Sequence, residues 1–203
     1  YTQLREKGKW TLRGEGLLWD SSWIKQNIEA ISTASPSLWR TWQEIKSSGL
    51  CDKIWAFYTV KGGTHIWLRT REPIARVVLP IRQYYVDKEG NRLPVTRPLD
   101  MPVIQMHRWD SLAVGLFSSW WQKYPWYHRA VSYLQQLPDG VWQGYLEISP
   151  EQFVLGRTVH LPTALEQWEV YLRLIQPKEG GNACEKVILY IPGQIICQRN
   201  QSI

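Results

Sequence analysis

The first third of the chain alternates between strand-like and helical patterns of apolar positions. Residues 12–16 form a short strand-like segment, and residues 20–31 and 35–48 then place apolar side chains on one face at helical spacing. Two β-rich runs, 53–60 and 64–71, follow, and the paired glycines between them indicate a tight hairpin. The order strand, helix, helix, strand, strand predicts a compact unit with two helices on one face of a small sheet.

Past Pro73 the pattern changes to short strands with two longer helical segments. Residues 112–137 are predicted to be helical with a break near Pro125, so that Leu134 lies on a helix face in the second half. Residues 163–175 form a strongly amphipathic helix. The predicted strands of this part cover residues 74–79, 83–87, 102–106, 141–148, 152–161, 186–191 and 194–198.

The composition is typical of a folded chain that buries a core, since apolar residues make up 44% and charged residues 21% of its 203 residues. We expect an α+β protein with an N-terminal domain at 1–76 and a C-terminal domain, mostly β with packed helices, at 77–203. No run of about 18 apolar residues is present, so no membrane span is predicted. The chain begins at Tyr1 rather than Met, which indicates part of a longer protein, and an upstream membrane anchor is left open.

Thirteen tryptophans are the main departure from ordinary composition. The ring favours burial and its N–H needs a partner, so a Trp-rich core is the first interpretation, and an aromatic surface for a partner, a sugar or bases is the second. The net charge is +6, but Lys and Arg are scattered rather than gathered in a block. We therefore expect no nucleic-acid partner, whereas a mildly basic surface facing an anionic membrane or cell-wall polymer fits equally well.

The three cysteines, Cys51, Cys184 and Cys197, are odd in number and include no CxxC pair, so neither a disulfide framework nor a zinc site is predicted. A two-residue Pro-Gly turn in the last hairpin would place Cys197 opposite Ile188. That register argues against a bond between Cys184 and Cys197, and we expect buried free thiols.

No catalytic or metal-binding motif stands out in the sequence. The four histidines have neither HxxxH nor HExxH spacing, and GxSxG, GxxxxGK[ST] and GxGxxG motifs are absent. Asp87 and Glu89 could pair as glycosidase acids do, but they lie beside a turn, where Asp usually binds its own backbone. We expect no enzymatic activity, no cofactor and no metal.

The most specific pattern lies at residues 71–90. It holds Arg-Glu-Pro-Ile-Ala at 71–75, an apolar strand, and then Tyr-Val-Asp-Lys-Glu-Gly at 85–90. This pattern resembles FtsQ, also called DivIB, a family of bacterial cell-division proteins. Further segments resemble the family in the same order at residues 12–28, 154–175 and 187–197, although in the first of them Glu15 stands where that family usually has Asn.

The resemblance implies an N-terminal POTRA-like domain and a C-terminal β domain on the periplasmic, extracytoplasmic side. It also implies a single transmembrane helix in the cytoplasmic membrane, upstream of Tyr1. The family is a non-enzymatic scaffold of the divisome, and its C-terminal region holds FtsB- and FtsL-like proteins. The expected function is therefore the recruitment of other division proteins.

A hairpin at the end of a chain can leave one strand edge open, and an incoming strand can pair with it. The predicted partner-binding residues are Ile188, Leu189, Tyr190, Ile191, Gly193, Gln194 and Ile195. The same hairpin could instead be an ordinary closing strand pair, with Ile188, Tyr190 and Ile195 in the core.

The pattern at residues 71–90 is interpreted as fixing the domain junction. Pro73 excludes a helix there, the strand that follows links the two domains, and Gly90 allows the hairpin. The predicted junction residues are Arg71, Glu72, Pro73, Ala75, Asp87 and Gly90. Two other function classes stay open: a different POTRA-containing envelope protein that binds polypeptides, and a Trp-rich module that binds glycans or nucleic acid.

Overall fold

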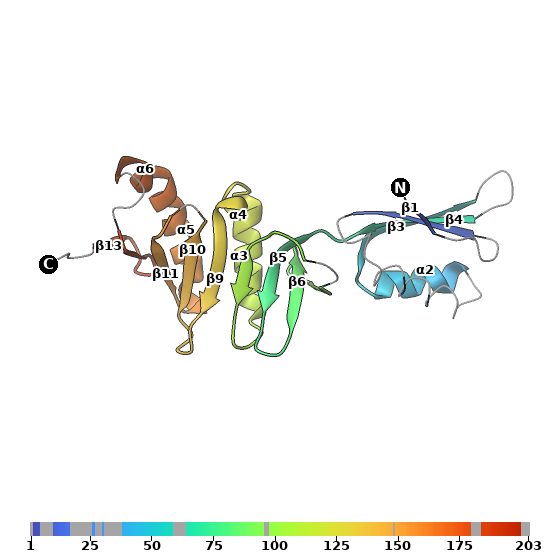
Figure 1. The fold of residues 1–203 in the computed structure, drawn as a ribbon, viewed down its shortest axis with the longest axis horizontal. Coiled ribbons are helices and arrows are strands. Elements are labelled where there is room, and N and C mark those ends of the chain that lie inside the picture. Colours follow the sequence, from blue (N-terminus) through green and yellow to red (C-terminus); the bar gives the residue numbers. More distant parts are fainter. Residues whose placement is uncertain are drawn as a thin grey trace. The chain divides into compact units, whose positions relative to one another are not determined.

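The computed structural model describes residues 2–4, 10–16, 26, 30, 38–58, 64–95, 98–147, 149–179 and 184–199. Its residues group into two compact units (Figure 1). Unit 1 comprises Tyr1–Pro73 and Leu93–Leu99, and unit 2 comprises Ile74–Arg92 and Asp100–Ile203. The helix predicted at 20–31 lies outside the described residues, except that residues 26 and 30 are helical.

Unit 1 contains a four-stranded sheet in the order β1-β2-β4-β3. Its strands are β1 (Thr2–Leu4), β2 (Trp10–Glu15), β3 (Cys51–Tyr58) and β4 (Thr64–Thr70). Strand β4, the last of these strands along the chain, lies between β2 and β3. It runs parallel to β2 and antiparallel to β3. The strands predicted at 12–16, 53–60 and 64–71 are therefore confirmed as β2, β3 and β4, while residues 59–60 and the predicted glycine turn at 61–63 lie outside the described residues.

Helix α2 (Leu38–Ser47) lies along one face of the unit 1 sheet (Figure 1). The helix ends before Gly49, whose φ of +70° is the left-handed conformation that glycine adopts without strain. Ile45 is 1% exposed, and Ile66 and Leu68 of β4 are fully buried. These apolar side chains form the described part of the unit 1 core, as the helical spacing in this segment predicts.

Unit 2 contains a mixed nine-stranded sheet in the order β13-β12-β11-β10-β9-β8-β5-β6-β7. Its strands are β5 (Pro73–Val78), β6 (Gln83–Asp87), β7 (Arg92–Leu93), β8 (Val103–Gln105), β9 (Val131–Gln136), β10 (Trp142–Leu146), β11 (Gln152–Gly156), β12 (Lys186–Ile188) and β13 (Ile196–Gln198). The pairs β5–β8, β8–β9 and β11–β12 are parallel, whereas β9–β10, β10–β11 and β12–β13 are antiparallel. The α+β class expected from the sequence is thus confirmed.

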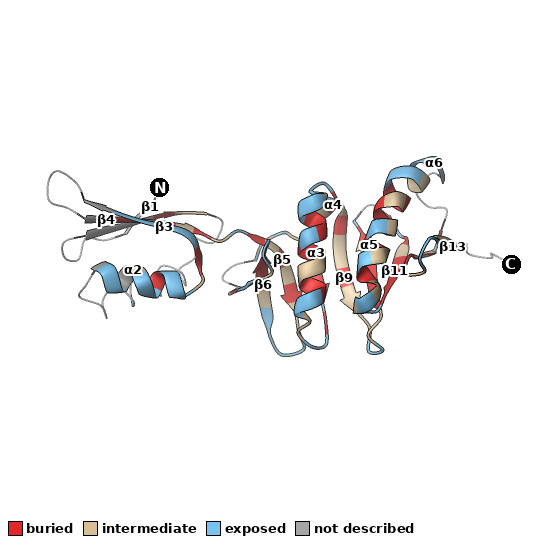
Figure 2. Ribbon diagram, turned by 180° about the vertical axis from the view of Figure 1, so that it is seen from behind, coloured by how far each residue is buried: buried red, intermediate tan, exposed pale blue. Residues whose placement is uncertain are grey.

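The helices of unit 2 lie on one face of this sheet (Figure 2). They are α3 (Ser111–Lys123), α4 (Tyr127–Ala130), a 3-10 turn (Thr158–His160) followed by α5 (Leu161–Val170), a π-helical turn (Tyr171–Ile175) and α6 (Gln176–Glu179). Asp110 caps α3 by accepting a hydrogen bond from the backbone N of Ala113 at 3.0 Å. The amphipathic helix predicted at 163–175 is confirmed, with a π-helical last part.

Aromatic rings form the centre of the unit 2 core. The ring of Trp168 stacks on Trp120 with a centroid distance of 5.2 Å, and Trp120 stacks in turn on Tyr127 at 5.2 Å. A Cβ atom at Gly144 would lie 2.4 Å from the ring of Trp168, so only glycine leaves room for the indole above β10. The Trp-rich core predicted from composition is therefore present in unit 2.

The prediction of a helix through residues 131–137 is wrong, because this segment is β9, a central strand. The register between β9 and β10 shifts after Tyr145, which pairs with Tyr133, since Leu146 pairs with Val131. Ser132 is thus the extra residue of a β-bulge. The bulge puts two buried residues of this strand three positions apart, and that spacing imitates a helix.

Candidate functional site

The C-terminal hairpin ends the nine-stranded sheet, and β13 is its last strand. Lys186 pairs with Gln198 and Ile188 pairs with Ile196. The predicted register, with Cys197 opposite Ile188, is wrong by one residue, because the connection between the strands is longer than a two-residue turn. Among the residues that the structure describes, no strand lies beyond β13 in this sheet.

The prediction that all three cysteines are free is wrong for two of them. Cys184 and Cys197 form a disulfide, with their Cα atoms 5.4 Å apart. Cys197 pairs with Val187 in the ladder, which brings it nearer to the start of β12 than the predicted register does. Cys51 is free and buried, as expected, and burial raises the pKa of its thiol to about 12.

The first three predicted partner-binding residues are held within unit 2 itself. Ile188 pairs with Val154 of β11 on one side and with Ile196 of β13 on the other. Leu189 is fully buried, and its backbone N donates to the carbonyl of Val154 at 2.9 Å. Tyr190 is half-buried against the core. These residues support the edge strand rather than forming the edge.

The next predicted residues, from Ile191 to Gln194, form an exposed turn that Gln167 of α5 holds in place. The side-chain Nε2 of Gln167 donates to the carbonyl of Leu189 at 2.5 Å and to that of Gln194 at 3.0 Å. Its Oε1 accepts from the backbone N of Gly193 at 2.7 Å. The turn is therefore fixed from the helix side. A single glutamine on an amphipathic helix gives no signal in the sequence that would have identified this role.

Gly156 at the end of β11 allows the close approach of Tyr190 to the sheet. The glycine has a φ of +76°, and a Cβ atom there would lie 2.6 Å from Cβ of Tyr190 and 2.9 Å from Nδ1 of His160. The rings of His160 and Tyr190 lie 5.7 Å apart. Any larger residue at position 156 would push this end of the hairpin outward.

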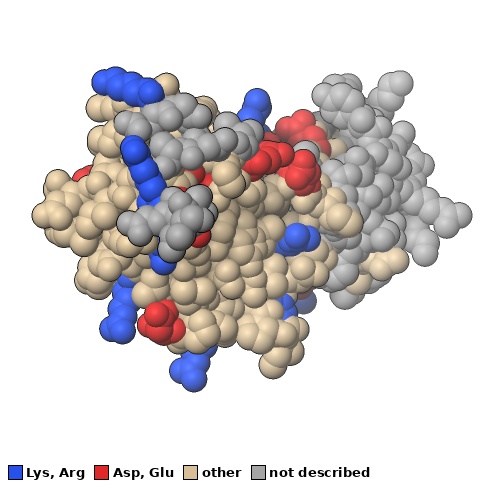
Figure 3. Space-filling model, turned by 60° about the vertical axis from the view of Figure 1, so that its left-hand side comes forward, with Lys and Arg blue, Asp and Glu red and all other residues tan. Residues whose placement is uncertain are grey.

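The edge strand carries mixed polarity. Ile195 and Ile196 are half-buried, whereas Gln198 is exposed. This end of unit 2 comes forward in Figure 3, where Lys and Arg side chains and some Asp and Glu side chains project from a largely uncharged surface. Glu185, directly before β12, is exposed. The edge therefore combines backbone and apolar side chains with charged residues of both signs.

The predicted junction residues fall on both sides of the division between the units. In unit 1, the backbone N of Arg71 donates to the carbonyl of Leu50 at 3.0 Å, and Glu72 forms an exposed ion pair with Arg69 at 3.3 Å. Pro73 is buried and begins β5. In unit 2, Ala75 is fully buried within the same strand. The stretch thus runs from one core into the other.

Asp87 and Gly90 build the turn after β6, as the sequence predicts. Oδ1 of Asp87 accepts from the backbone N of Glu89 at 3.1 Å and of Asn91 at 2.8 Å, and Oδ2 accepts from Nδ2 of Asn91 at 3.0 Å. Gly90 has a φ of +79°, and its N donates to the carbonyl of Asp87 at 2.9 Å. Because turn contacts engage both carboxylate oxygens, Asp87 has a structural role.

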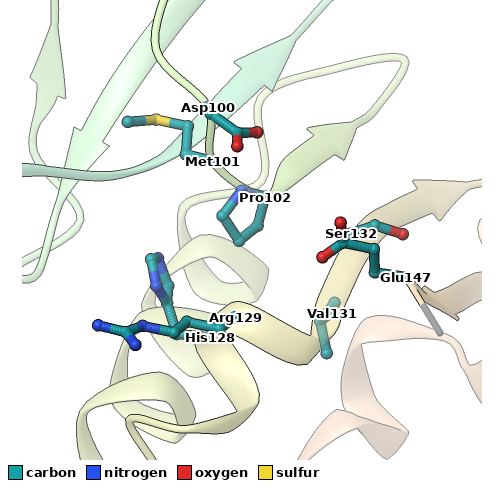
Figure 4. A pocket seen from close by; sticks show the side chains of 8 residues that line it. All are labelled: Asp100, Met101, Pro102, His128, Arg129, Val131, Ser132 and Glu147. Atoms are coloured by element: carbon teal, nitrogen blue, oxygen red, sulfur yellow. The ribbon is translucent and has the colours of Figure 1, made fainter.

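A cavity of about 310 Å³ in unit 2 is an alternative candidate site. It is lined by Asp100, Met101, Pro102, His128, Arg129, Val131, Ser132 and Glu147. Figure 4 shows Ser132 and Glu147 on one side of Pro102, and His128 and Arg129 on the other. Nε2 of His128 contacts the carbonyl of Ile74, and the hydroxyl of Ser132 donates to the carbonyl of Tyr145 at 3.4 Å. The lining therefore shows no nucleophile hydrogen-bonded to a base.

Comparison with known proteins adds no relative. No protein-family model matches the chain, and no curated protein matches its sequence. Within the described parts of the chain, no group of three or more His, Cys, Asp or Glu residues is placed to hold a metal ion. The helices seen in these parts include none with the length and apolar character of a membrane span.

Proposed function

We propose that this chain is the extracytoplasmic part of an FtsQ/DivIB-like scaffold of bacterial cell division. In this proposal it lies on the periplasmic side of the cytoplasmic membrane, anchored by an upstream segment, and performs no catalysis. It recruits FtsB- and FtsL-like proteins through its C-terminal hairpin. The observation that carries the proposal is the position of β13 as the last described strand of the nine-stranded sheet.

The arrangement of unit 1 supports this proposal. A POTRA-like domain has two strands after its helices, and the same order occurs here as β2, α2, β3 and β4. Strand β4 lies between β2 and β3 and runs parallel to β2. The motif at residues 71–90 then connects this unit to unit 2, as the resemblance implies for two successive domains.

Within this proposal, the strand that pairs with the partner is β13 rather than the segment predicted from the sequence. The residues from Ile188 to Gln194 form an inner strand and a turn fixed by Gln167. A fixed edge loses little conformational entropy when a partner strand pairs with it, which favours binding. In the proposal, Ile196 and Gln198 meet the partner strand, and the sequence-predicted residues hold them in position.

The sharpest test replaces Ile196 with lysine, because a charged side chain on an edge strand opposes the addition of another strand. The matched control is Ile81→Lys, since Ile81 is 92% exposed at the turn between β5 and β6. Binding of an immobilised FtsB-like extracytoplasmic segment to residues 1–203 of each variant is measured by surface plasmon resonance. Ile196→Lys is expected to weaken binding at least about tenfold, while Ile81→Lys leaves it unchanged.

Equal binding by Ile196→Lys and the parent chain would exclude β13 as the docking strand. Absence of binding by the parent chain would reject the division-scaffold proposal itself. Equal binding of an unrelated unfolded polypeptide would favour a general polypeptide-binding envelope protein. Circular dichroism of each variant checks that the fold is retained.

A further inference from the structure

The second face of the unit 2 sheet carries no helix among the residues that the structure describes. Helices α3 and α5 cover one face (Figure 2), and no described helix crosses the other face, which is turned to the viewer in Figure 1. The strand register separates the two faces. The residues that face the helices in successive strands are fully buried, and they are Val77, Ile104, Leu134, Phe153 and Val187.

Two neighbouring rows of side chains cross this second face. The first row runs through Val103, Tyr133, Tyr145 and Gln152, and the second runs through Gln105, Gln135, Gln143 and Val154. Six of these residues are uncharged and polar, with flat end groups, and together they are called the glutamine–tyrosine face. They are Gln105, Tyr133, Gln135, Gln143, Tyr145 and Gln152.

The glutamine–tyrosine face is preorganised by its own hydrogen bonds. Nε2 of Gln152 donates to Oε1 of Gln143 at 2.7 Å and to the hydroxyl of Tyr145 at 3.0 Å. The hydroxyl of Tyr133 donates to Oε1 of Gln105. Burial, and then the neighbouring Tyr145, raise the pKa of Tyr133, so its hydroxyl stays protonated at neutral pH.

Hydrogen-bonding capacity remains available to a ligand. A side-chain amide has two N–H donors and an oxygen with two acceptor positions. Oε1 of the half-buried Gln152 is not used within the face, and neither is Nε2 of Gln143, whose side chain is 8% exposed. Gln135, which is half-buried, forms no side-chain hydrogen bond to any other described residue. The rings of Tyr133 and Tyr145 lie 5.9 Å apart and add flat apolar area.

This chemistry selects the kind of ligand. Nucleic acid would need cations along the path of its phosphates, but the rows carry charge only at Arg76 and Lys186, at their two ends. An anionic lipid surface would also need cations on this face. A protein interface would need an apolar centre, whereas the centre here is made of carboxamides. Hydroxyl groups and sugar rings match both the amides and the tyrosine faces.

The dimensions also fit a linear polymer. Adjacent strands are about 4.8 Å apart, so the four strands β8 to β11 span about 14 Å, close to the length of about three linked pyranose rings. We propose that the glutamine–tyrosine face binds an uncharged, β-linked polysaccharide, whose flat ribbon lies across these strands. The site is separate from the edge strand β13, so it adds a second binding function to the proposed scaffold.

The test measures binding of chitohexaose and cellohexaose to the chain of residues 1–203 by isothermal titration calorimetry. Tyr133→Ala removes a ring, and Gln135→Ala removes an amide that has no partner in the described structure. We expect Tyr133→Ala to weaken binding about tenfold and Gln135→Ala about threefold, with little dependence on salt. The matched control is Gln122→Ala, because Gln122 is an exposed glutamine on α3.

Several outcomes would overturn this proposal. These are no binding of either hexasaccharide up to its solubility limit, or equal binding by the two face variants and the parent chain. Salt-sensitive binding of DNA or heparin with no hexasaccharide binding would assign the surface to polyanions. Self-association lost in Tyr133→Ala would assign it to a second copy. Ile196→Lys should keep hexasaccharide binding, so this proposal and the proposed scaffold function fail independently.

Discussion

The described tryptophans are distributed differently in the two units. Both place helices on one face of a sheet, but unit 2 buries Trp142 and Trp168 completely in its core. Unit 1 instead keeps Trp39 at 64% exposure and Trp55 at 42% exposure. An abundance of tryptophan therefore indicates neither a core nor a surface by itself, because the fold decides which rings are covered.

The exposed rings of unit 1 pair with each other. Trp39 stacks on Trp42 with centroids 5.0 Å apart, and Trp55 of β3 meets Trp67 of β4 at 4.3 Å. Aromatic pairs of this kind, whether across strands or along a helix, stabilise a fold by about 0.5–1.5 kcal/mol beyond the contribution of their buried area. The described part of unit 1 thus depends on ring pairs at its surface, whereas unit 2 depends on a continuous buried stack.

The largest loss of stability should follow removal of the Trp168 ring from the buried aromatic stack of unit 2. The Trp168→Ala change removes contacts to Trp120 and Phe153, whose ring centroids lie 5.2 Å and 4.9 Å away, and opens a cavity above Gly144. We expect the free energy of unfolding of unit 2 to fall by about 3–5 kcal/mol. Urea unfolding followed by circular dichroism measures this loss.

Trp126→Ala is the matched control, because Trp126 is 60% exposed in the same unit. Its expected loss is below about 1 kcal/mol. Equal losses for the two variants would show that the aromatic stack does not dominate the stability of unit 2.

The disulfide should give the next largest effect, again confined to unit 2. Cys184 and Cys197 are 13 residues apart, and closing a loop of this length stabilises a fold by about 3 kcal/mol. A Cys184→Ser/Cys197→Ser double variant should lose about that amount in thermal unfolding. The double variant should also no longer respond to a reducing agent, whereas Cys51→Ala should respond as the parent does.

Gly156→Ala tests the close approach at the end of β11. The backbone strain of a left-handed residue and the collision with Tyr190 together should cost about 1–3 kcal/mol. Gly140→Ala separates the two causes, because Gly140 has a similar φ of +84° with no atom near the added Cβ. If both variants lose the same stability in urea unfolding, the contact with Tyr190 contributes nothing.

The smallest effect is a pH dependence specific to unit 1. Burial raises the pKa of Cys51 from 9.0 to about 12, so above pH 9 the unfolded thiol ionises while the folded thiol keeps its proton. Stability is therefore full below pH 9 and is lost as the pH rises toward 12. At pH 10 the loss should be about 1.4 kcal/mol. The comparison is with Cys51→Ala, which should lack this part of the pH dependence, and urea unfolding followed by circular dichroism measures both chains at each pH.

Much of the fold follows from local sequence patterns. The segments 53–60 and 64–71 are predictable as strands because β-rich residues flank a glycine pair, and 83–87 is predictable because an Asp-Lys-Glu-Gly turn begins at its last residue. The segment at 131–137 was misread, because a bulge changes the spacing of buried residues from two to three. A bulge depends on the partner strand, which the local sequence does not contain.

The candidate site was only partly predictable for a related reason. The terminal hairpin is visible in the sequence, but its register depends on the length of the turn between β12 and β13. That turn is held by Gln167, which is distant in the sequence, so no local rule gives its length. The error of one residue in the register also led to the wrong prediction for Cys184 and Cys197.

The loop closed by Cys184 and Cys197 encloses the whole hairpin connection, including the turn that Gln167 holds. Cys197 is exposed, so a reductant can reach the bond. Once it is cleaved, the three-residue strand β13 would fray first, and β12 would become the border of the sheet. That border carries Val187 and Ile188. Strand β12 would stay paired with β11, but its other edge would be unpaired, and an unpaired apolar edge promotes aggregation. We therefore expect the disulfide to protect the protein from precipitation as well. A preparation made under reducing conditions should form insoluble material more readily.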